Sequence, residues 1–236
     1  MIETFTAERP RQSIAEVSVA SGLDRATARR CLLTLARHGY AEYDGKFFTL
    51  RPRILRLGTA CLATMPLPQI VQPLLDDLSE CIGQSSSVSI LDGEEIVYVA
   101  RAAQRKVMSI GLMPGSRLPA YCTSMGRVLL AAMPEAEARA ILLRQALPAR
   151  TPMTRTDPEA ILNELARVKA QGFALIDQEV EIGLRSIAVP IRNAHRQTVA
   201  ALNIGASAFH QSTEGMQSAY LADLLSLQSS LAPLLR

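Results

Sequence analysis

Signals that start and stop helices are packed closely in the first 50 residues, and they leave room only for short elements. Residues 13–16 read S-x-x-E, a capping box in which the Ser and Glu side chains accept hydrogen bonds from backbone amides at a helix start. Gly22 ends this helix, because glycine readily adopts the left-handed conformation of a tight turn. Asp24 can cap a second helix, which runs to about His38 and stops at Gly39. The segment is therefore predicted to form two short helices joined by a tight turn.

The second of these helices is amphipathic. Its predicted buried side consists of Ala28, Cys31, Leu32 and Leu35, and its predicted exposed side consists of Ala26, Arg29, Arg30 and Arg37. Two short helices with a glycine turn, the second with outward arginines, are typical of a helix-turn-helix motif that binds DNA. The alternative is two ordinary surface helices whose arginines are solvated.

A predicted hairpin follows this pair directly. Asp44-Gly45 lies between two runs of β-prone residues, which is a strong short-range signal for a hairpin turn. A hairpin in this position is a wing, and Lys46, with Arg51 and Arg53 beyond it, is placed to contact flanking phosphates. The predicted DNA-binding residues are Arg25, Ala26, Thr27, Arg29, Arg30 and Lys46.

Positive charge is concentrated in the same part of the chain. Residues 1–60 hold ten Lys and Arg against six Asp and Glu, a net charge of +4, whereas residues 61–236 hold fifteen against sixteen, a net charge of −1. A basic N-terminal segment joined to a near-neutral remainder indicates that the N-terminal segment contacts an anionic polymer and that the remainder has another function. A basic face that only aids solubility is the alternative.

The rest of the chain predicts an α+β fold. A helix predicted for residues 53–64 is interrupted by Pro66 and Pro68, since proline lacks an amide donor and restrains the residue before it. Further helices are predicted at 69–82, 124–133, 135–145, 158–171 and 213–234, and strands at 86–91, 95–100, 106–111, 173–177, 186–192 and 198–206. Segments in this order are typical of an antiparallel sheet flanked by helices.

Signatures of catalysis, of metal binding and of a cofactor are missing from the sequence. The three histidines are scattered, the four cysteines show no CxxC spacing, and no G-x-S-x-G, H-E-x-x-H, G-x-x-x-x-G-K-[ST] or G-x-G-x-x-G occurs. No cofactor and no metal are expected. Scattered cysteines, no run of about 20 apolar residues and no secretory signal favour a cytoplasmic protein with no membrane partner.

Two weak enzyme signals in the sequence have ordinary structural alternatives. Cys122 beside Thr123 and Ser124 could act as a nucleophile, but a buried free cysteine is the commoner case. Glu179 and Glu181 could form an acid–base pair, but a solvated strand edge is the preferred interpretation. An enzyme is therefore the least favoured class.

Several segments resemble the IclR family of transcriptional regulators. They are LDRATARRCLLTLARHGY, LPAYCTSMGRVLLAAMP, QGFALIDQEVEIGLRSIAVPIRN and VAALNIGASA. AYCTSMGRVLLA and LDRATARR are most similar to the subgroup that governs aromatic-acid catabolism through the β-ketoadipate pathway, the protocatechuate and 4-hydroxybenzoate regulators. The resemblance implies a winged helix-turn-helix that dimerises on DNA, often as a dimer of dimers, and a GAF/PAS-like effector domain with a ligand pocket over the sheet.

With this resemblance, the predicted domains are a winged helix-turn-helix at 1–52, a linker helix at 53–65 and an effector-binding domain at 66–236. Only Met1–Phe5 stands ahead of the predicted helix pair, where members of the family carry a full first helix. That helix is expected to be truncated here, either by a start placed late or by a shortened chain.

The resemblance also implies a set of effector-binding positions. They are Ser124, Met125, Ile176, Ser186, Asn203 and Gly205. Ser124 and Met125 supply backbone amides at a helix start, which suit a carboxylate without a buried cation. Ile176 replaces an acidic residue of small-keto-acid sensors and Gly205 replaces a hydroxyl, so a roomier and more apolar pocket is expected. Alternatively, Ser186 and Asn203 are satisfied polar residues of the core.

Strand alternation adds one geometric expectation, that Arg185 lies on the opposite face of its strand from Ser186. The expected partners are a double-stranded DNA operator, a second copy of the chain and a small carboxylic acid, with protocatechuate, 4-hydroxybenzoate and β-ketoadipate as candidates. The alternatives are a regulator of another catabolic route that senses a non-aromatic acid, and a small-molecule sensor domain without DNA function.

Overall fold

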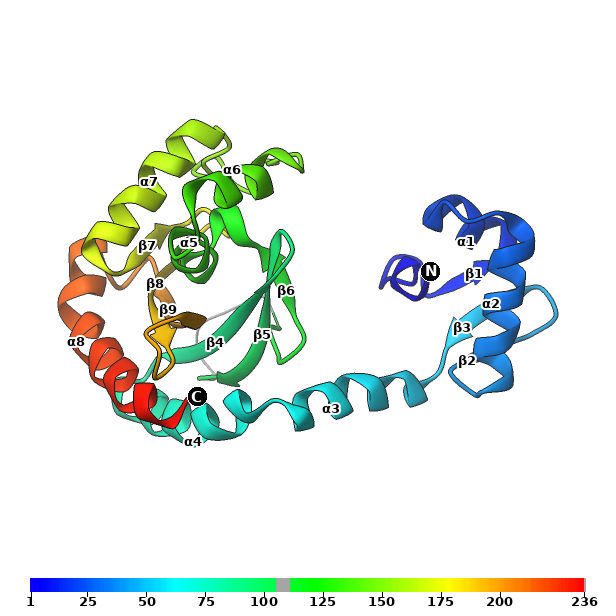
Figure 1. Ribbon diagram of the computed structural model, residues 1–236, viewed down its shortest axis with the longest axis horizontal. Helices are drawn as coiled ribbons and strands as arrows, with labels where there is room; N and C mark the ends of the chain where they lie inside the picture. The colour runs from blue at the N-terminus through cyan, green and yellow to red at the C-terminus, as the bar shows by residue number, and fades with distance from the viewer. Residues whose placement is uncertain (105–110, 236) are drawn as a thin grey trace. The chain divides into compact units, whose positions relative to one another are not determined.

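The computed structural model describes residues 1–104 and 111–235, which divide into two compact units, Met1–Thr64 and Met65–Arg236 (Figure 1). The elements of the first unit are the 3-10 turn η1 (Ile2–Thr4), β1 (Arg11–Ser13), α1 (Ile14–Ser21), α2 (Arg25–Arg37), β2 (Ala41–Tyr43), β3 (Phe47–Leu50), η2 (Pro52–Ile54) and α3 (Leu55–Thr64). Its three strands form an antiparallel sheet in the order β1-β3-β2.

The two short helices form as their caps predict. The Ser13 amide donates to Glu16 Oε2 at 2.7 Å and the Glu16 amide donates to Ser13 Oγ at 3.3 Å, which completes the capping box. Gly22 has a φ of +69° at the turn, and the Thr27 amide donates to Asp24 Oδ1 at 2.9 Å at the start of α2. The predicted helix-turn-helix is confirmed.

The predicted hairpin is also confirmed, as β2 and β3. The carboxylate of Asp44 accepts the amides of Lys46 and Phe47 at 2.9 and 2.8 Å, and these bonds, the one from Phe47 first, lower the pKa of Asp44 to about 2. Strand β1 was not foreseen. It is three residues long and exists through its pairing with β3, in which Gln12 lies opposite Phe48.

The core of the first unit follows the predicted apolar face of α2 in part. It consists of Val17, Ala28, Leu32, Ala41 and Phe48, all buried. Leu35 packs against this core but stays half-buried, as does Cys31. A small core of this kind holds the two helices on the three-stranded sheet.

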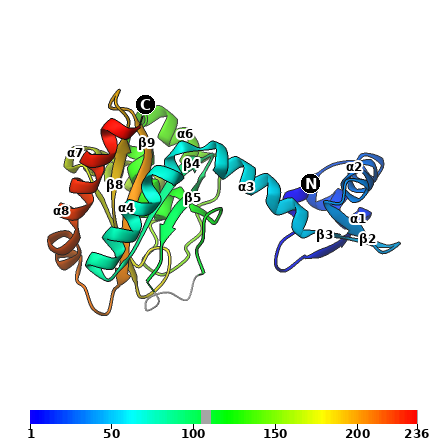
Figure 2. The ribbon, with the colours of Figure 1, turned by 90° about the horizontal axis from the view of Figure 1, so that it is seen from below.

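The second unit is a six-stranded antiparallel sheet with helices on both faces. Its elements are α4 (Pro66–Ile82), β4 (Ser85–Asp92), β5 (Glu95–Ala102), β6 (Arg117–Pro119), η3 (Ala120–Cys122), α5 (Ser124–Ala131), α6 (Glu135–Leu143), α7 (Pro158–Gln171), β7 (Ala174–Asp177), β8 (Leu184–Arg192), β9 (Thr198–Ser207), α8 (Thr213–Leu231) and η4 (Ala232–Leu234). The strand order is β6-β5-β4-β9-β8-β7. Helices α4 and α8 cover one face of the sheet (Figure 2), while α5 lies on the other face with α6 and α7 outside it (Figure 1). The α+β fold with an antiparallel sheet is therefore confirmed.

Element boundaries differ from the prediction in a few places. Helix α4 begins at Pro66 rather than at 69, because amides in the first turn of a helix have no intrahelical acceptor and prolines are tolerated there. The short strand β6 was not predicted, and most of the strand predicted for 106–111 lies outside the described residues. Within the described part of the chain no single helix is long and apolar enough to cross a membrane, although α3 and α4 reach that length and composition as a bent pair.

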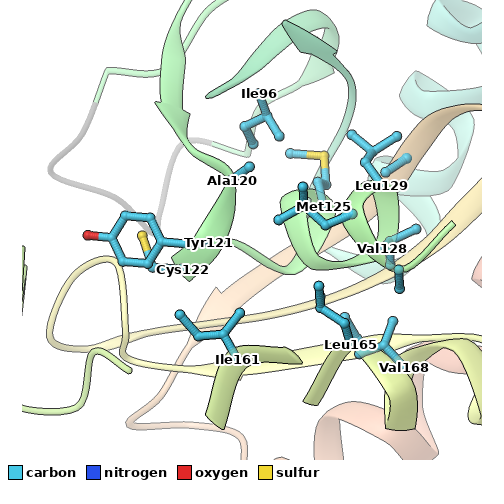
Figure 3. Packing of buried hydrophobic residues seen from close by; sticks show 14 of the residues in the cluster. Ile96, Ala120, Tyr121, Cys122, Met125, Val128, Leu129, Ile161, Leu165 and Val168 are labelled. Carbon is cyan, nitrogen blue, oxygen red and sulfur yellow. The ribbon is translucent and has the colours of Figure 1, made fainter. Parts of the chain in front are cut away.

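The main core of the second unit lies between α5 and the helix α7. Met125, Val128 and Leu129 of α5 are buried, and Leu165 and Val168 point toward them from α7 (Figure 3). Gly126 lies where α5 contacts η3, and a Cβ added there would overlap backbone atoms of Ala120. The start of α5 is therefore held in a fixed position over the sheet.

Candidate functional site

The outer face of α2 is a cluster of unpaired cations. Arg25, Ala26, Arg29 and Arg30 are exposed, and Thr27 is half-buried. One guanidinium NH2 of Arg30 donates to Thr27 Oγ1 at 3.2 Å, which holds the arginine along the helix. Among the described residues, Arg25, Arg29 and Arg30 have no ion-pair partner within the first unit. Such a face is free to contact an anionic ligand.

The wing presents a further exposed cation, Lys46. Arg11 pairs with Asp44, and Arg51 pairs with Glu42 at 3.4 Å. Lys46 is exposed, and its Nζ lies 5.0 Å from the ring centroid of Phe47. Among the described residues Lys46 forms no ion pair, although its charge contributes, after hydrogen bonds from Ser13, to the lowered pKa of Glu16. The predicted DNA-binding residues thus lie on α2 and on the wing, where the sequence analysis put them.

A small cavity lies between the start of α5 and the sheet. Its lining consists of Tyr98, Arg101, Leu112, Leu118, Thr123, Ser124, Met125, Val180, Leu184, Ser186, Asn203 and Gly205. Five of the six predicted effector-binding positions are in this lining, and Ile176 is not. The volume of about 30 Å³ is large enough for one water molecule, whereas a benzene-binding cavity measures about 150 Å³. In this structure the cavity is too small for an aromatic acid, and the expectation that it is roomier than the pocket of a small-keto-acid sensor stays a prediction.

Strand register brings the lining residues together. Ser186 lies opposite Gly205, and Ala188, two residues further, lies opposite Asn203, so these four share one face of the sheet. Ile176 lies opposite Ser186 on the outer strand β7. It belongs to the same face and is buried, but it does not line the cavity.

Arg185 lies on the other face, as alternation requires. Its Nε donates to Asp177 Oδ1 at 2.6 Å, and another guanidinium nitrogen donates to the Ala208 carbonyl at 2.9 Å. That prediction is confirmed.

The start of α5 offers two donors toward the cavity. Thr123 Oγ1 accepts the amide of Gly126 at 3.1 Å, so the first-turn amides of Ser124 and Met125 have no intrahelical acceptor. Ser186 Oγ donates to Ser124 Oγ at 2.8 Å, which makes Ser186 a satisfied core residue. Asn203 differs, because its buried Oδ1 has no partner among the described residues.

A cation in the cavity was not foreseen, and the expectation of a site without one is wrong. Arg101 of β5 lines the cavity and donates through Nη1 to Ser87 Oγ at 2.8 Å. Burial lowers the pKa of its guanidinium. Strict alternation would place Tyr98 and Arg101 on opposite faces, but the β4–β5 register shifts between Val88 and Ser89, and this β-bulge brings both to the cavity. The bulge has no sequence signal that we could identify.

A buried ion pair between Arg127 and Glu179 holds α5 in place. Arg127 donates to Glu179 through two bonds of 2.9 and 2.7 Å, and its Nε donates to the Tyr121 carbonyl at 3.1 Å. The two side chains are 1% and 6% exposed. The expectation that Glu179 lies at a solvated edge is therefore wrong, because its partner is 52 residues away in the sequence.

Cys122 is the buried free cysteine that the sequence analysis preferred. Burial raises the pKa of its thiol to about 11, so the thiol is protonated at neutral pH. A nucleophilic cysteine requires the thiolate, which this environment disfavours.

Comparisons with known proteins cover nearly the whole chain. The family model described as "Bacterial transcriptional regulator IclR C-terminal" matches residues 59–230, and the model "IclR helix-turn-helix domain" matches residues 1–45. The Pca regulon regulatory protein of Pseudomonas putida is 41% identical over 98% of this chain and 80% of its own length. The p-hydroxybenzoate hydroxylase transcriptional activator of Acinetobacter baylyi is 34% identical over 94% of this chain and 82% of its own.

One solved structure adds a bound ligand. An IclR homologue from Microbacterium hydrocarbonoxydans, complexed with 4-hydroxybenzoate, superimposes with a TM-score of 0.73. It is 26% identical, and the match covers 98% of this chain and 95% of the homologue.

Proposed function

The chain belongs to the IclR family of bacterial transcriptional regulators, and from this premise we propose that it controls genes of aromatic-acid catabolism in response to a small carboxylic acid. In this proposal residues 1–52 bind DNA, residues 53–65 link the two functions, and residues 66–236 bind the effector. The observation that carries it is the cavity at the start of α5, whose described lining combines free helix amides and a cation with no carboxylate. A regulator that reads bacterial DNA works in the cytoplasm.

The effector candidates are protocatechuate, 4-hydroxybenzoate and β-ketoadipate. Two relatives named for the Pca regulon and for p-hydroxybenzoate hydroxylase support this class, as does the 4-hydroxybenzoate bound to the homologue. The amides of Ser124 and Met125 are donors for an oxygen of the effector, and Ser186 and Asn203 lie across the cavity from them. An aromatic acid is larger than the present cavity, so we propose that the lining side chains move when it binds.

Replacing Ser186 by leucine is expected to abolish the response to the acid. The new side chain would fill the cavity and remove the hydrogen bond to Ser124. We would titrate 4-hydroxybenzoate and protocatechuate by calorimetry and measure operator binding with and without each acid. Ser218→Leu, on the exposed side of α8, is the matched control and keeps the response.

Operator binding without ligand should survive in Ser186→Leu, because the first unit is untouched. Normal acid binding by Ser186→Leu, or no heat with either acid on the wild-type chain, would show that the cavity is not the effector site.

The DNA half of the proposal concerns Arg30 and Lys46. Arg30→Ala is expected to weaken binding to the preferred duplex by about 1–3 kcal/mol and to relax the preference at one base pair, because a side chain in the major groove reads base edges. Lys46→Ala should weaken binding to all duplexes alike and reduce the salt slope by about one, because it contacts phosphate.

These variants can be compared on duplexes that the wild-type chain selects from a random library. Arg144→Ala removes an exposed cation from the second unit and is the charge-matched control. Wild-type affinity and specificity in Arg30→Ala would remove α2 from the DNA interface. Two-fold operators require a two-fold protein, so we also propose a homodimer or a dimer of dimers.

A further inference from the structure

The cavity holds one formal charge and no counter-charge. Of the described residues that line it, Arg101 alone is charged, and neither Asp nor Glu is present. The Arg101 side chain is half-buried, but its Nε is buried and has no partner among the described residues, which is costly for a polar group. An anion that enters this cavity would supply the counter-charge that its described lining lacks.

The guanidinium of Arg101 is held in place by a hydrogen bond, but not all of its donors have a partner among the described residues. Its Nη1 donates to Ser87 Oγ at 2.8 Å, which gives the side chain a defined direction, and its backbone amide donates to Gln72 Oε1 at 3.2 Å. Its Nε is buried and has no hydrogen-bond partner among the described residues. The guanidinium thus keeps at least one buried donor for a ligand.

Asn203 has a buried acceptor, rather than a donor, without a partner among the described residues. It is 8% exposed, lines the same cavity, and its buried Oδ1 accepts no hydrogen bond from the described residues. Asn203 lies opposite Ser87, and Ser87 lies opposite Arg101, so the three occupy neighbouring strands on one face. At about 4.8 Å per strand the backbones of Asn203 and Arg101 are roughly 10 Å apart.

We infer that Arg101 binds the carboxylate of the effector and that Asn203 Oδ1 accepts a hydrogen bond from a hydroxyl at the effector's other end. This inference rests on the proposed function and defines the ligand class, a hydroxy acid whose two polar groups are separated by about one aromatic ring. The carboxylate of the effector then lies at Arg101 and not at the amides of Ser124 and Met125. A guanidinium carries a full charge, whereas a helix start is equivalent to about half a charge.

The test compares an acid with its uncharged analogue on the full chain. Calorimetry with 4-hydroxybenzoate and 4-hydroxybenzamide is expected to show a strong preference of the wild-type chain for the acid. Arg101→Gln should lose about 10- to 100-fold in affinity for the acid and change little toward the amide, because a hydrogen bond to a charged group is removed. Arg117→Gln, which removes an exposed cation from β6, is the matched control and should keep the wild-type preference.

Two further variants keep the test decisive. Ser87→Ala retains the charge but frees the guanidinium, and it should lower the acid's affinity severalfold even if Arg101→Gln does not fold. Asn203→Leu should reduce the preference for 4-hydroxybenzoate over benzoate and leave the preference for acid over amide intact.

The outcomes separate this inference from the function on which it rests. If Arg101→Gln or Ser87→Ala binds 4-hydroxybenzoate like the wild-type chain, the carboxylate lies elsewhere, at the start of α5, and the inference is wrong while the proposed function stands. If the wild-type chain binds no aromatic acid, both fail.

Discussion

Arg127→Met is expected to lower the free energy of unfolding of the second unit by about 3 kcal/mol, because it leaves the buried carboxylate of Glu179 with only the backbone amide of Arg155 and the Arg155 guanidinium, whose Nε lies 3.9 Å away. The substitution also removes the bond from Arg127 to the Tyr121 carbonyl, which ties α5 to η3. Urea unfolding followed by circular dichroism measures the change.

The matched control is Arg139→Met. Arg139 forms ion pairs with Glu135 and Glu159 on the exposed faces of α6 and α7, where water screens them, and the midpoint should hardly change. The double variant Arg127→Met, Glu179→Leu should recover much of the loss, since it removes both charges together. Equal midpoints for Arg127→Met and Arg139→Met would show that the buried pair does not support the fold.

Gly126→Ala is expected to destabilise the second unit by about 3 kcal/mol or more, at the upper end of the range for overpacking. The added methyl group would overlap backbone atoms of Ala120, and backbone cannot rotate away as a side chain can. Either α5 or η3 has to move, and both line or adjoin the cavity. Thermal unfolding should show the loss, and acid binding should weaken with it.

Gly58→Ala is a control for which we expect a higher, not a lower, free energy of unfolding. Gly58 lies inside α3, where an added Cβ meets nothing within 4 Å, so alanine should stabilise the helix by about 0.5–1 kcal/mol. A Gly126→Ala chain as stable as the Gly58→Ala chain would mean that the contact between α5 and η3 is not tight.

Local signals account for what the sequence predicts well. The capping box before Glu16, the cap at Asp24 and the Asp44-Gly45 turn each depend on residues within a few positions, and each forms as expected. Strands β1 and β6 were missed because three residues carry too little pattern by themselves and depend on a distant partner. The start of α4 was predicted three residues late, because a proline interrupts a helix interior but is tolerated in the first turn, where Pro66 and Pro68 lie.

The cavity lining was predicted less completely than the fold. Ser186 and Asn203 came from the resemblance, and strand register explains why they share a face. Arg101 was missed because a single bulge in β5 reverses which residues face inward. Glu179 was assigned to solvent because its partner lies on another element, and the closed state of the cavity depends on side-chain packing that spacing does not encode.

The small volume of the cavity bears on how sensitively the regulator responds. If the proposed site is correct, the described form, whose cavity measures about 30 Å³, has to open before an aromatic acid enters, and the apparent dissociation constant exceeds the intrinsic one by the inverse of the open fraction. Two regulators with the same contacts to the acid can therefore have different thresholds. The threshold shifts with any substitution that changes the open population, even one at a residue that the acid never touches.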